Sequence, residues 1–145
     1  MQSKTIRLNN FKGADNIAHE TQITGKLSEL TAAKALMSVG WEIAFPVVPE
    51  VYDLIGRDPL NGQYARFQCK TVRVRDDREG ARVVYARKGN GQPYTSNDCE
   101  YMLGVMGDTV YMFECTGNAE YWATETSASK RWVELTANNE AEAVL

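Results

Sequence analysis

The sequence predicts a single α+β domain, an α/β arrangement in which a mixed β-sheet core is flanked by helices. Three observations predict this fold. One stretch has the composition and periodicity of a helix, and several shorter stretches after it have those of strands. The chain of 145 residues, with 43% hydrophobic and 24% charged residues, is also long enough to bury one sizeable core.

The two ends of the chain differ from its middle. Residues 1–23 are polar and aperiodic, which favours a flexible N-terminal arm, and residues 136–145 are expected to form a tail that frays. We therefore expect the folded domain to span residues 24–135. The sequence has no apolar run of about 18 residues and no secretory signal at its start, so we expect a cytoplasmic protein that makes no membrane contact.

Residues 25–39, GKLSELTAAKALMSV, predict the first helix, because they are rich in Ala, Leu and Lys and are followed by Gly40, a residue that commonly ends helices. A step of about 100° per residue puts six apolar side chains on one arc, namely Leu30, Ala32, Ala33, Leu36, Met37 and Val39. Glu29 falls inside this arc. A buried carboxylate is costly, so Glu29 needs a lysine, a metal ion or the helix N-terminus as its partner.

Six later segments are rich in β-branched and aromatic residues and are separated by turn residues, a pattern typical of strands. They are residues 41–48, 51–56, 64–75, 81–87, 101–106 and 109–115. The polar stretch 89–98 predicts a loop with a helical turn at its end. The chain after Gly117 has no pattern strong enough for an assignment.

Two kinds of residue are left out of the predicted site. The cysteines, Cys69, Cys99 and Cys115, are odd in number and far apart, which fits neither a zinc site nor a disulfide framework, so we expect them to pack as small apolar groups. Tyr94 lies in the predicted loop, where an ordinary loop aromatic explains it.

Three polar side chains join Glu29 at positions that a core would not choose. The alternation of a strand puts Asp53 on one face with Val51 and Ile55. The same period of two points Gln68 and Lys70 in one direction. If residues 58–62 close a hairpin, Asp53, Gln68 and Lys70 converge on one patch, and we expect the helix that carries Glu29 to pack over that same sheet face.

This cluster combines oxygen ligands with an amine. The Asp53 carboxylate, the Gln68 amide oxygen and the Cys69 backbone carbonyl suit a hard cation such as Mg²⁺, for which Mn²⁺ should substitute. Lys70 would then lie beside the metal-bound water. Such groups can supply a nucleophile and neutralise charge during phosphodiester hydrolysis. The alternative is a buried acid–lysine pair that fixes the helix on the sheet without chemistry.

The charge of the chain is unevenly distributed. The net charge of −3 disfavours nonspecific binding of polyanions, yet residues 57–88 hold nine Lys and Arg against four Asp and Glu, a net +5. The rest of the chain holds seven against fifteen, a net −8. The basic segment is either a set of solvated strand faces or a nucleic-acid footprint beside the site.

The ordered set of Glu29, Asp53 and the Gln68-Cys69-Lys70 stretch resembles the PD-(D/E)XK nuclease superfamily, in which a helical Glu precedes a strand Asp and then an acid-x-Lys on the next strand. The resemblance spans residues 25–115. Gln68 stands where the superfamily has an acid, and Tyr52 where its name implies Pro. The Gln variant and the QCKTVR stretch are similar to those of homing endonucleases encoded in group I introns.

The resemblance implies a metal-dependent endonuclease that hydrolyses phosphodiester bonds of double-stranded DNA at a defined site, with residues 24–135 as the nuclease-like domain. It implies that Asp53 binds the metal, that Gln68 positions metal or water and that Lys70 orients the nucleophile, while Glu29 completes the metal environment. Members that cut both strands usually act as homo-oligomers, here a dimer or tetramer.

The basic segment supplies the expected DNA contacts. Seven residues are candidates for binding backbone phosphates: Arg66, Arg73, Arg75, Arg78, Arg82, Arg87 and Lys88. Two other functions stay open. One is a catalytically silent member of the same fold that binds DNA or a protein, and the other is a structure-specific nuclease, such as a junction resolvase or repair enzyme, that recognises DNA by shape.

Overall fold

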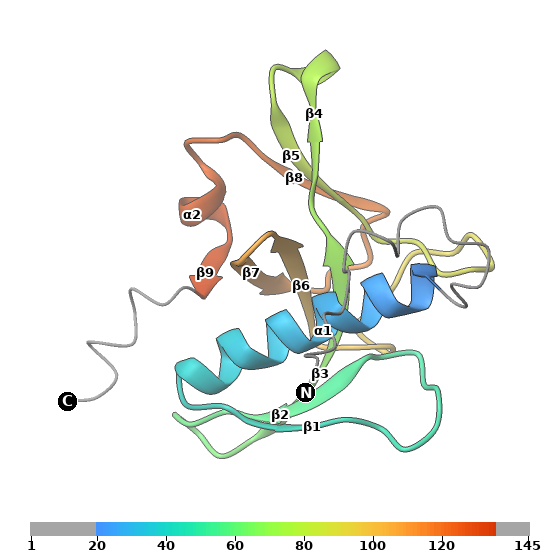
Figure 1. The fold of residues 1–145 in the computed structure, drawn as a ribbon, viewed down its shortest axis with the longest axis vertical. Coiled ribbons are helices and arrows are strands. Elements are labelled where there is room, and N and C mark those ends of the chain that lie inside the picture. Colours follow the sequence, from blue (N-terminus) through green and yellow to red (C-terminus); the bar gives the residue numbers. More distant parts are fainter. Residues whose placement is uncertain (1–19, 136–145) are drawn as a thin grey trace, which may run out of the picture.

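The computed structural model describes residues 20–135 as two sheets and two helices (Figure 1). The elements are α1 (Glu20–Ser38), β1 (Glu42–Ala44), β2 (Leu54–Arg57), β3 (Tyr64–Thr71), β4 (Arg73–Arg75), the 3₁₀ helix η2 (Asp76–Arg78), β5 (Ala81–Tyr85), β6 (Tyr101–Met106), β7 (Thr109–Glu114), β8 (Glu120–Ala123), α2 (Ala128–Arg131) and β9 (Val133–Leu135). The mixed α+β fold predicted from the sequence is confirmed. Neither described helix is long and apolar enough to cross a membrane.

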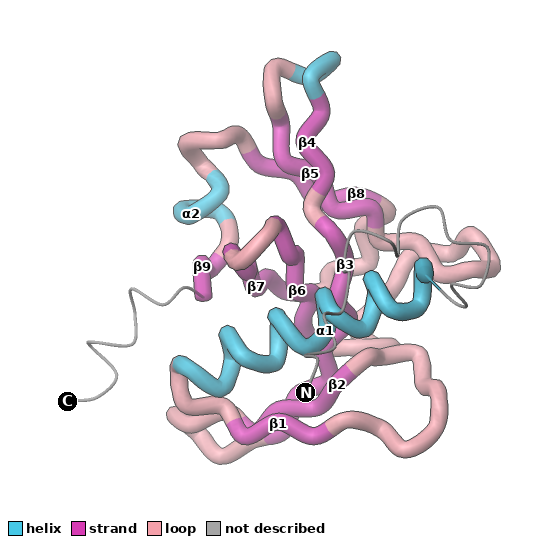
Figure 2. The backbone as a smooth tube through the Cα atoms, in the orientation of Figure 1, coloured by secondary structure: helices cyan, strands magenta, loops and turns pink. Residues whose placement is uncertain are grey.

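The larger sheet has six strands in the order β1-β2-β3-β6-β7-β9, and the smaller has the order β4-β5-β8. Strands β3 and β6 pair in parallel, and the other neighbours pair antiparallel. A parallel pair needs a long crossover connection, which here contains β4 and β5 in place of a helix. These two strands and η2 project beyond the larger sheet (Figure 2).

Strand β3 separates two hydrophobic cores. On one face, Ala32, Ala33 and Leu36 of α1 pack against a group that includes Phe67 and Cys69. The second core lies on the opposite face and joins the two sheets, with Met102, Val72, Val84, Phe113 and Trp132 among its members. All three cysteines are free and buried, as expected for small apolar groups.

The first helix differs from its prediction in extent and in buried surface. It begins at Glu20, so the arm predicted for residues 1–23 overlaps its first turn, while residues 1–19 and 136–145 lie outside the described part. Leu30 and Met37, expected on the buried arc, are 49% and 55% exposed. The reason is that α1 contacts the sheet through the narrow Ala32–Ala33 stripe, which leaves the edges of the predicted arc in solvent.

The strand predictions are confirmed closely in one hairpin only. Strands β6 and β7 match residues 101–106 and 109–115 to within one residue. Strand β1 is three residues long against the predicted 41–48, and β2 begins at Leu54 against the predicted 51–56, so Asp53 lies just outside the strand. The single strand predicted for residues 64–75 is instead divided, because buried Val72 donates its N–H to Val105 O at 2.9 Å and the chain then enters the second sheet as β4. Strands β8 and β9, of four and three residues, follow Gly117 and were not predicted.

Gly104 is a sensitive point of the second core. A Cβ at this position would lie 2.9 Å from Val72 Cγ2 and 3.1 Å from Val84 Cγ2. We therefore expect Gly104→Ala to lower the free energy of unfolding by about 1–3 kcal/mol through overpacking, as measured by urea denaturation. In the matched control Gly89→Ala the added methyl meets no atom within 4 Å, and we expect a change within about 0.5 kcal/mol. Equal effects of the two substitutions would contradict this account of the core.

Candidate active site

Asp53 lies immediately before β2 and continues its pairing with β3. Its backbone N–H donates to Phe67 O at 2.8 Å, and its side-chain Oδ2 accepts the Cys69 N–H at 2.9 Å. The chain bends at residues 51–53, so the regular ladder stops here. The Asp53 carboxylate therefore takes the place of the strand carbonyl that would otherwise accept the Cys69 N–H.

Glu29 reaches Asp53 from α1. Burial is the largest cause that raises the pKa of Asp53 from its ordinary 3.8 to about 6; the Cys69 hydrogen bond opposes it, and the nearby Glu29 carboxyl adds to it. Glu29 Oε2 also pairs with Lys26 Nζ at 2.9 Å, and its side chain is 20% exposed. Two carboxyl groups thus meet at a half-buried place where a proton or a cation must compensate their charge.

Gln68 and Lys70 lie on the face of β3 opposite to the one that packs against α1. Gln68 is 8% exposed and pairs in register with Met102, a member of the second core. The Lys70 ammonium lies 5.3 Å from the centre of the Tyr94 ring, and its charge lowers the pKa of Asp53. Continuing the Leu54–Phe67 register by one residue puts Asp53 beside Gln68.

The predicted position of the helix is wrong. We expected α1 to cover the face that bears Gln68 and Lys70, but α1 covers the face of Phe67 and Cys69. Glu29 meets Asp53 at the position just before β2 begins, where the regular ladder between β2 and β3 stops. The structure therefore brings Glu29, Asp53 and Lys70 into electrostatic contact around an edge, with Gln68 in register beside them.

The donor groups at this edge fit a divalent cation that keeps open coordination positions. Within residues 20–135 no group of three His, Cys, Asp or Glu side chains could hold a metal ion. Mg²⁺ commonly uses one or two carboxylates together with waters and substrate phosphates, so the acids Asp53 and Glu29 suffice. The Cys69 carbonyl points to the same strand edge as the Cys69 N–H that Asp53 accepts, which makes it a third available oxygen.

A cavity of about 340 Å³ gives access to the two acids. It is lined by Lys26, Glu29, Tyr52, Asp53 and the segment 46–50. The charge of the site therefore faces a space large enough for a phosphate group and water.

Two residues of this neighbourhood were not predicted. Tyr94 is 8% exposed, and burial together with the charge of Asp53 raises its pKa to about 12. It reaches Lys70 from a loop, where no periodicity could indicate it. Lys26 could have been found, because it precedes Glu29 by three residues on a helix, a spacing at which side chains pair.

Most of the predicted phosphate contacts already have partners within the protein. Arg66 pairs with Glu100 and donates to the Asn97 carbonyl. Arg75, Arg78, Arg82 and Lys88 pair with Asp77, Glu120, Glu125 and Asp98, respectively. Arg73 and Arg87 are the two candidates for which the described part of the chain provides no acidic partner.

The raised pKa of Asp53 makes a prediction about stability in metal-free buffer. Between pH 3.8 and about 6 the native protein holds a proton that the unfolded chain releases, so the free energy of unfolding falls as pH rises through this window. Asp53→Asn removes that fall. Allowing for solvent screening, we expect this variant to be more stable than the parent by about 1–2 kcal/mol near neutral pH. Below pH 3.8 the two should converge, and urea denaturation in EDTA across this range measures the difference.

The control is Asp108→Asn, in an exposed turn. A parent protein with a flat pH profile, or an Asp53→Asn variant less stable than the parent near neutral pH, would contradict the raised pKa.

Comparison with known proteins identifies a similar fold. No protein-family model matches the chain, and no curated protein matches it. Among solved structures, the chain is similar to that of a bacterial homing endonuclease, I-Ssp6803I. The sequence identity is 20% and the TM-score is 0.59, and the match covers 73% of this chain and 79% of that chain. The likeness at this identity concerns the fold, which is homing-endonuclease-like.

Proposed function

We propose that this chain is a metal-dependent endonuclease that hydrolyses phosphodiester bonds of double-stranded DNA at a defined site. The observation that carries the proposal is the meeting of two carboxyl groups, Asp53 and Glu29, at the edge of a cavity, with the charge of Lys70 acting on Asp53. Perturbed acids in a cleft are typical of catalytic and metal sites. The homing-endonuclease-like fold supports the proposal of endonuclease activity on DNA.

Each residue would have a distinct role. Asp53, Glu29, the Cys69 carbonyl and the Gln68 amide oxygen would hold Mg²⁺, and Mn²⁺ would substitute. The bound ion would supply Lewis acidity and an activated water. Lys70 would orient the nucleophile and stabilise the negative charge that develops on the phosphate oxygens. Lys26, which pairs with Glu29 in this structure, would release the carboxylate when a cation binds.

One centre per chain cuts one strand at a time. Cleavage of both strands at a defined site would therefore require a homo-oligomer, a dimer or tetramer, in which symmetry places two centres on the duplex.

A catalytically silent DNA- or protein-binding domain is the second candidate. It is favoured by Gln68, which stands where an acid would complete a three-acid metal site. A structure-specific nuclease would use the same residues on branched DNA, so the choice of substrate separates it from a site-specific enzyme.

Cleavage of a mixed library of linear and branched duplexes in Mg²⁺, Mn²⁺ or EDTA tests the proposal. We expect Asp53→Ala and Lys70→Ala to fold, to keep most of their DNA binding and to cut at least about 10³-fold more slowly, because each removes a group that acts on the reacting phosphate. The exposed helix variant Lys34→Ala is the control. Metal-independent cutting, or either site variant cutting at the parental rate, would contradict the site; binding without cutting in every metal would favour the silent domain.

Gln68→Glu tests the metal ligands separately. An added carboxylate beside Asp53 should lower the Mg²⁺ concentration needed for half-maximal cleavage by about tenfold, because Mg²⁺ prefers charged oxygen ligands. In EDTA the same substitution should destabilise the fold, since three acids then repel one another. Because Gln and Glu have nearly the same size and shape, this substitution changes the charge without changing the packing. An unchanged Mg²⁺ requirement would exclude Gln68 from the metal environment.

A further inference from the structure

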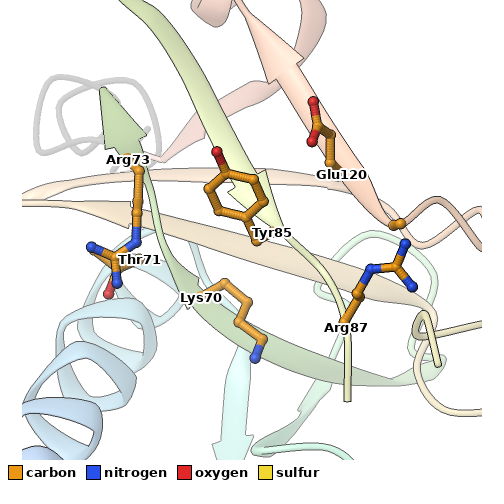
Figure 3. Close-up of a pocket in the computed structure, with 7 residues that line it drawn as sticks. Lys70, Thr71, Arg73, Tyr85, Arg87 and Glu120 are labelled. Atoms are coloured by element: carbon orange, nitrogen blue, oxygen red, sulfur yellow. The ribbon is translucent and has the colours of Figure 1, made fainter. Parts of the chain in front are cut away.

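A second cavity, of about 400 Å³, lies where β3 passes into the smaller sheet. Seven residues line it: Lys70, Thr71, Arg73, Tyr85, Arg87, Ala119 and Glu120. Figure 3 shows Lys70, Arg73 and Arg87 around the Tyr85 ring. Lys70 and Arg73 come from the continuous run of β3 and β4, and Arg87 follows β5. Lys70 is the residue that this cavity shares with the neighbourhood of Asp53.

The cavity carries excess positive charge. Glu120 is the one acid that lines the cavity, and its Oε1 pairs with Arg78 Nη1 at 2.6 Å. Arg73 and Arg87 have no acidic partner within residues 20–135. Arg87 donates one hydrogen bond, from Nη1 to the Gly91 carbonyl oxygen at 2.7 Å. A guanidinium has five N–H donors, so most of those of Arg87 are available to a ligand. Three cations around one space, with the only acid already paired, suit an anion.

We propose that this cavity binds a backbone phosphate of the DNA strand next to the phosphate that is cut, an inference that rests on the proposed function. The planar fork of arginine matches phosphate oxygens in a bidentate geometry. Lys70 lines this cavity and follows Gln68, the residue that the register of β2 and β3 puts beside Asp53, by two residues on the same face, so it would lie between the two phosphates. A strand held at both points is fixed in register with the acids, which is what phosphate contacts provide in DNA recognition.

The proposal divides the seven basic residues into two classes. Arg73 and Arg87 bind the flanking phosphate. The other five pair with acids of the protein: Arg66, Arg75, Arg78, Arg82 and Lys88. Sequence alone treats all seven alike. Their partners separate them.

The test measures the affinity of the full chain for short linear duplex DNA of mixed sequence, in EDTA and over a range of salt concentrations. Arg73→Gln and Arg87→Gln should each weaken binding about three- to tenfold at low salt and reduce the slope of log affinity against log salt by about 0.9, the value for one lost phosphate contact. The control is Arg57→Gln. Arg57 pairs in register with Tyr64 at the start of β3, whereas Lys70 lies near the end of that strand. The affinity and slope of this variant should match those of the parent.

Glu120→Gln gives an effect of the opposite sign, which partial unfolding cannot imitate. It removes the acid from the cavity and frees Arg78, so binding should tighten by about two- to fivefold. Parental affinity and slope in both arginine variants, or no tightening in Glu120→Gln, would overturn the proposal. Because binding is read without cleavage, these results are separable from the nuclease assay. If the arginine variants bind DNA more weakly but the parent never cuts it, the phosphate subsite stands and the nuclease proposal fails. If the parent cuts DNA but both arginine variants bind it as the parent does, the nuclease proposal stands and the subsite fails.

Discussion

Strand β3 is the constraint on which the rest of the structure depends. Strands β2 and β6 pair with its two edges, α1 covers one face and the second core covers the other. Alternation along the strand therefore leaves each side chain one direction only. A slip of one residue would turn Gln68 and Lys70 toward α1 and Phe67 away from it. The register that buries Phe67 is thus also the register that points Lys70 toward the candidate site.

The candidate site lies where this order stops. The Asp53 carboxylate completes the pairing of β3 by accepting the Cys69 N–H, so it cannot move away without leaving a strand N–H unpaired. Glu29 is held by the packing of α1. Two acids fixed by separate elements therefore remain close, and burial, with the Glu29 carboxyl adding to it, raises the pKa of Asp53. The proposed divalent cation would offset the negative charge of these two acids.

Features that depend on local pattern could be predicted from the sequence. The helix around Glu29, the alternation of Gln68 and Lys70, and the hairpin that brings Asp53 beside β3 all follow from neighbours in the chain. Features that depend on distant pairing could not. The face that α1 covers is built from residues of β3, β6, β7 and β9 together, and our expectation of that face was wrong. In the same way, the partner of Arg78 is Glu120, 42 residues away, so no local pattern separates paired arginines from available ones.

The most direct test of the central claim, that Asp53 and Glu29 form a divalent-cation site, is anomalous diffraction from crystals of the full chain soaked in Mn²⁺. The account predicts one anomalous peak within coordination distance of an Asp53 carboxylate oxygen and the Cys69 carbonyl, accompanied by loss of the Lys26–Glu29 ion pair, and no such peak in crystals of Asp53→Asn. Crystals in which Mn²⁺ binds elsewhere, while Lys26 still pairs with Glu29, would contradict it and leave the cluster as a structural pairing of acids and lysines.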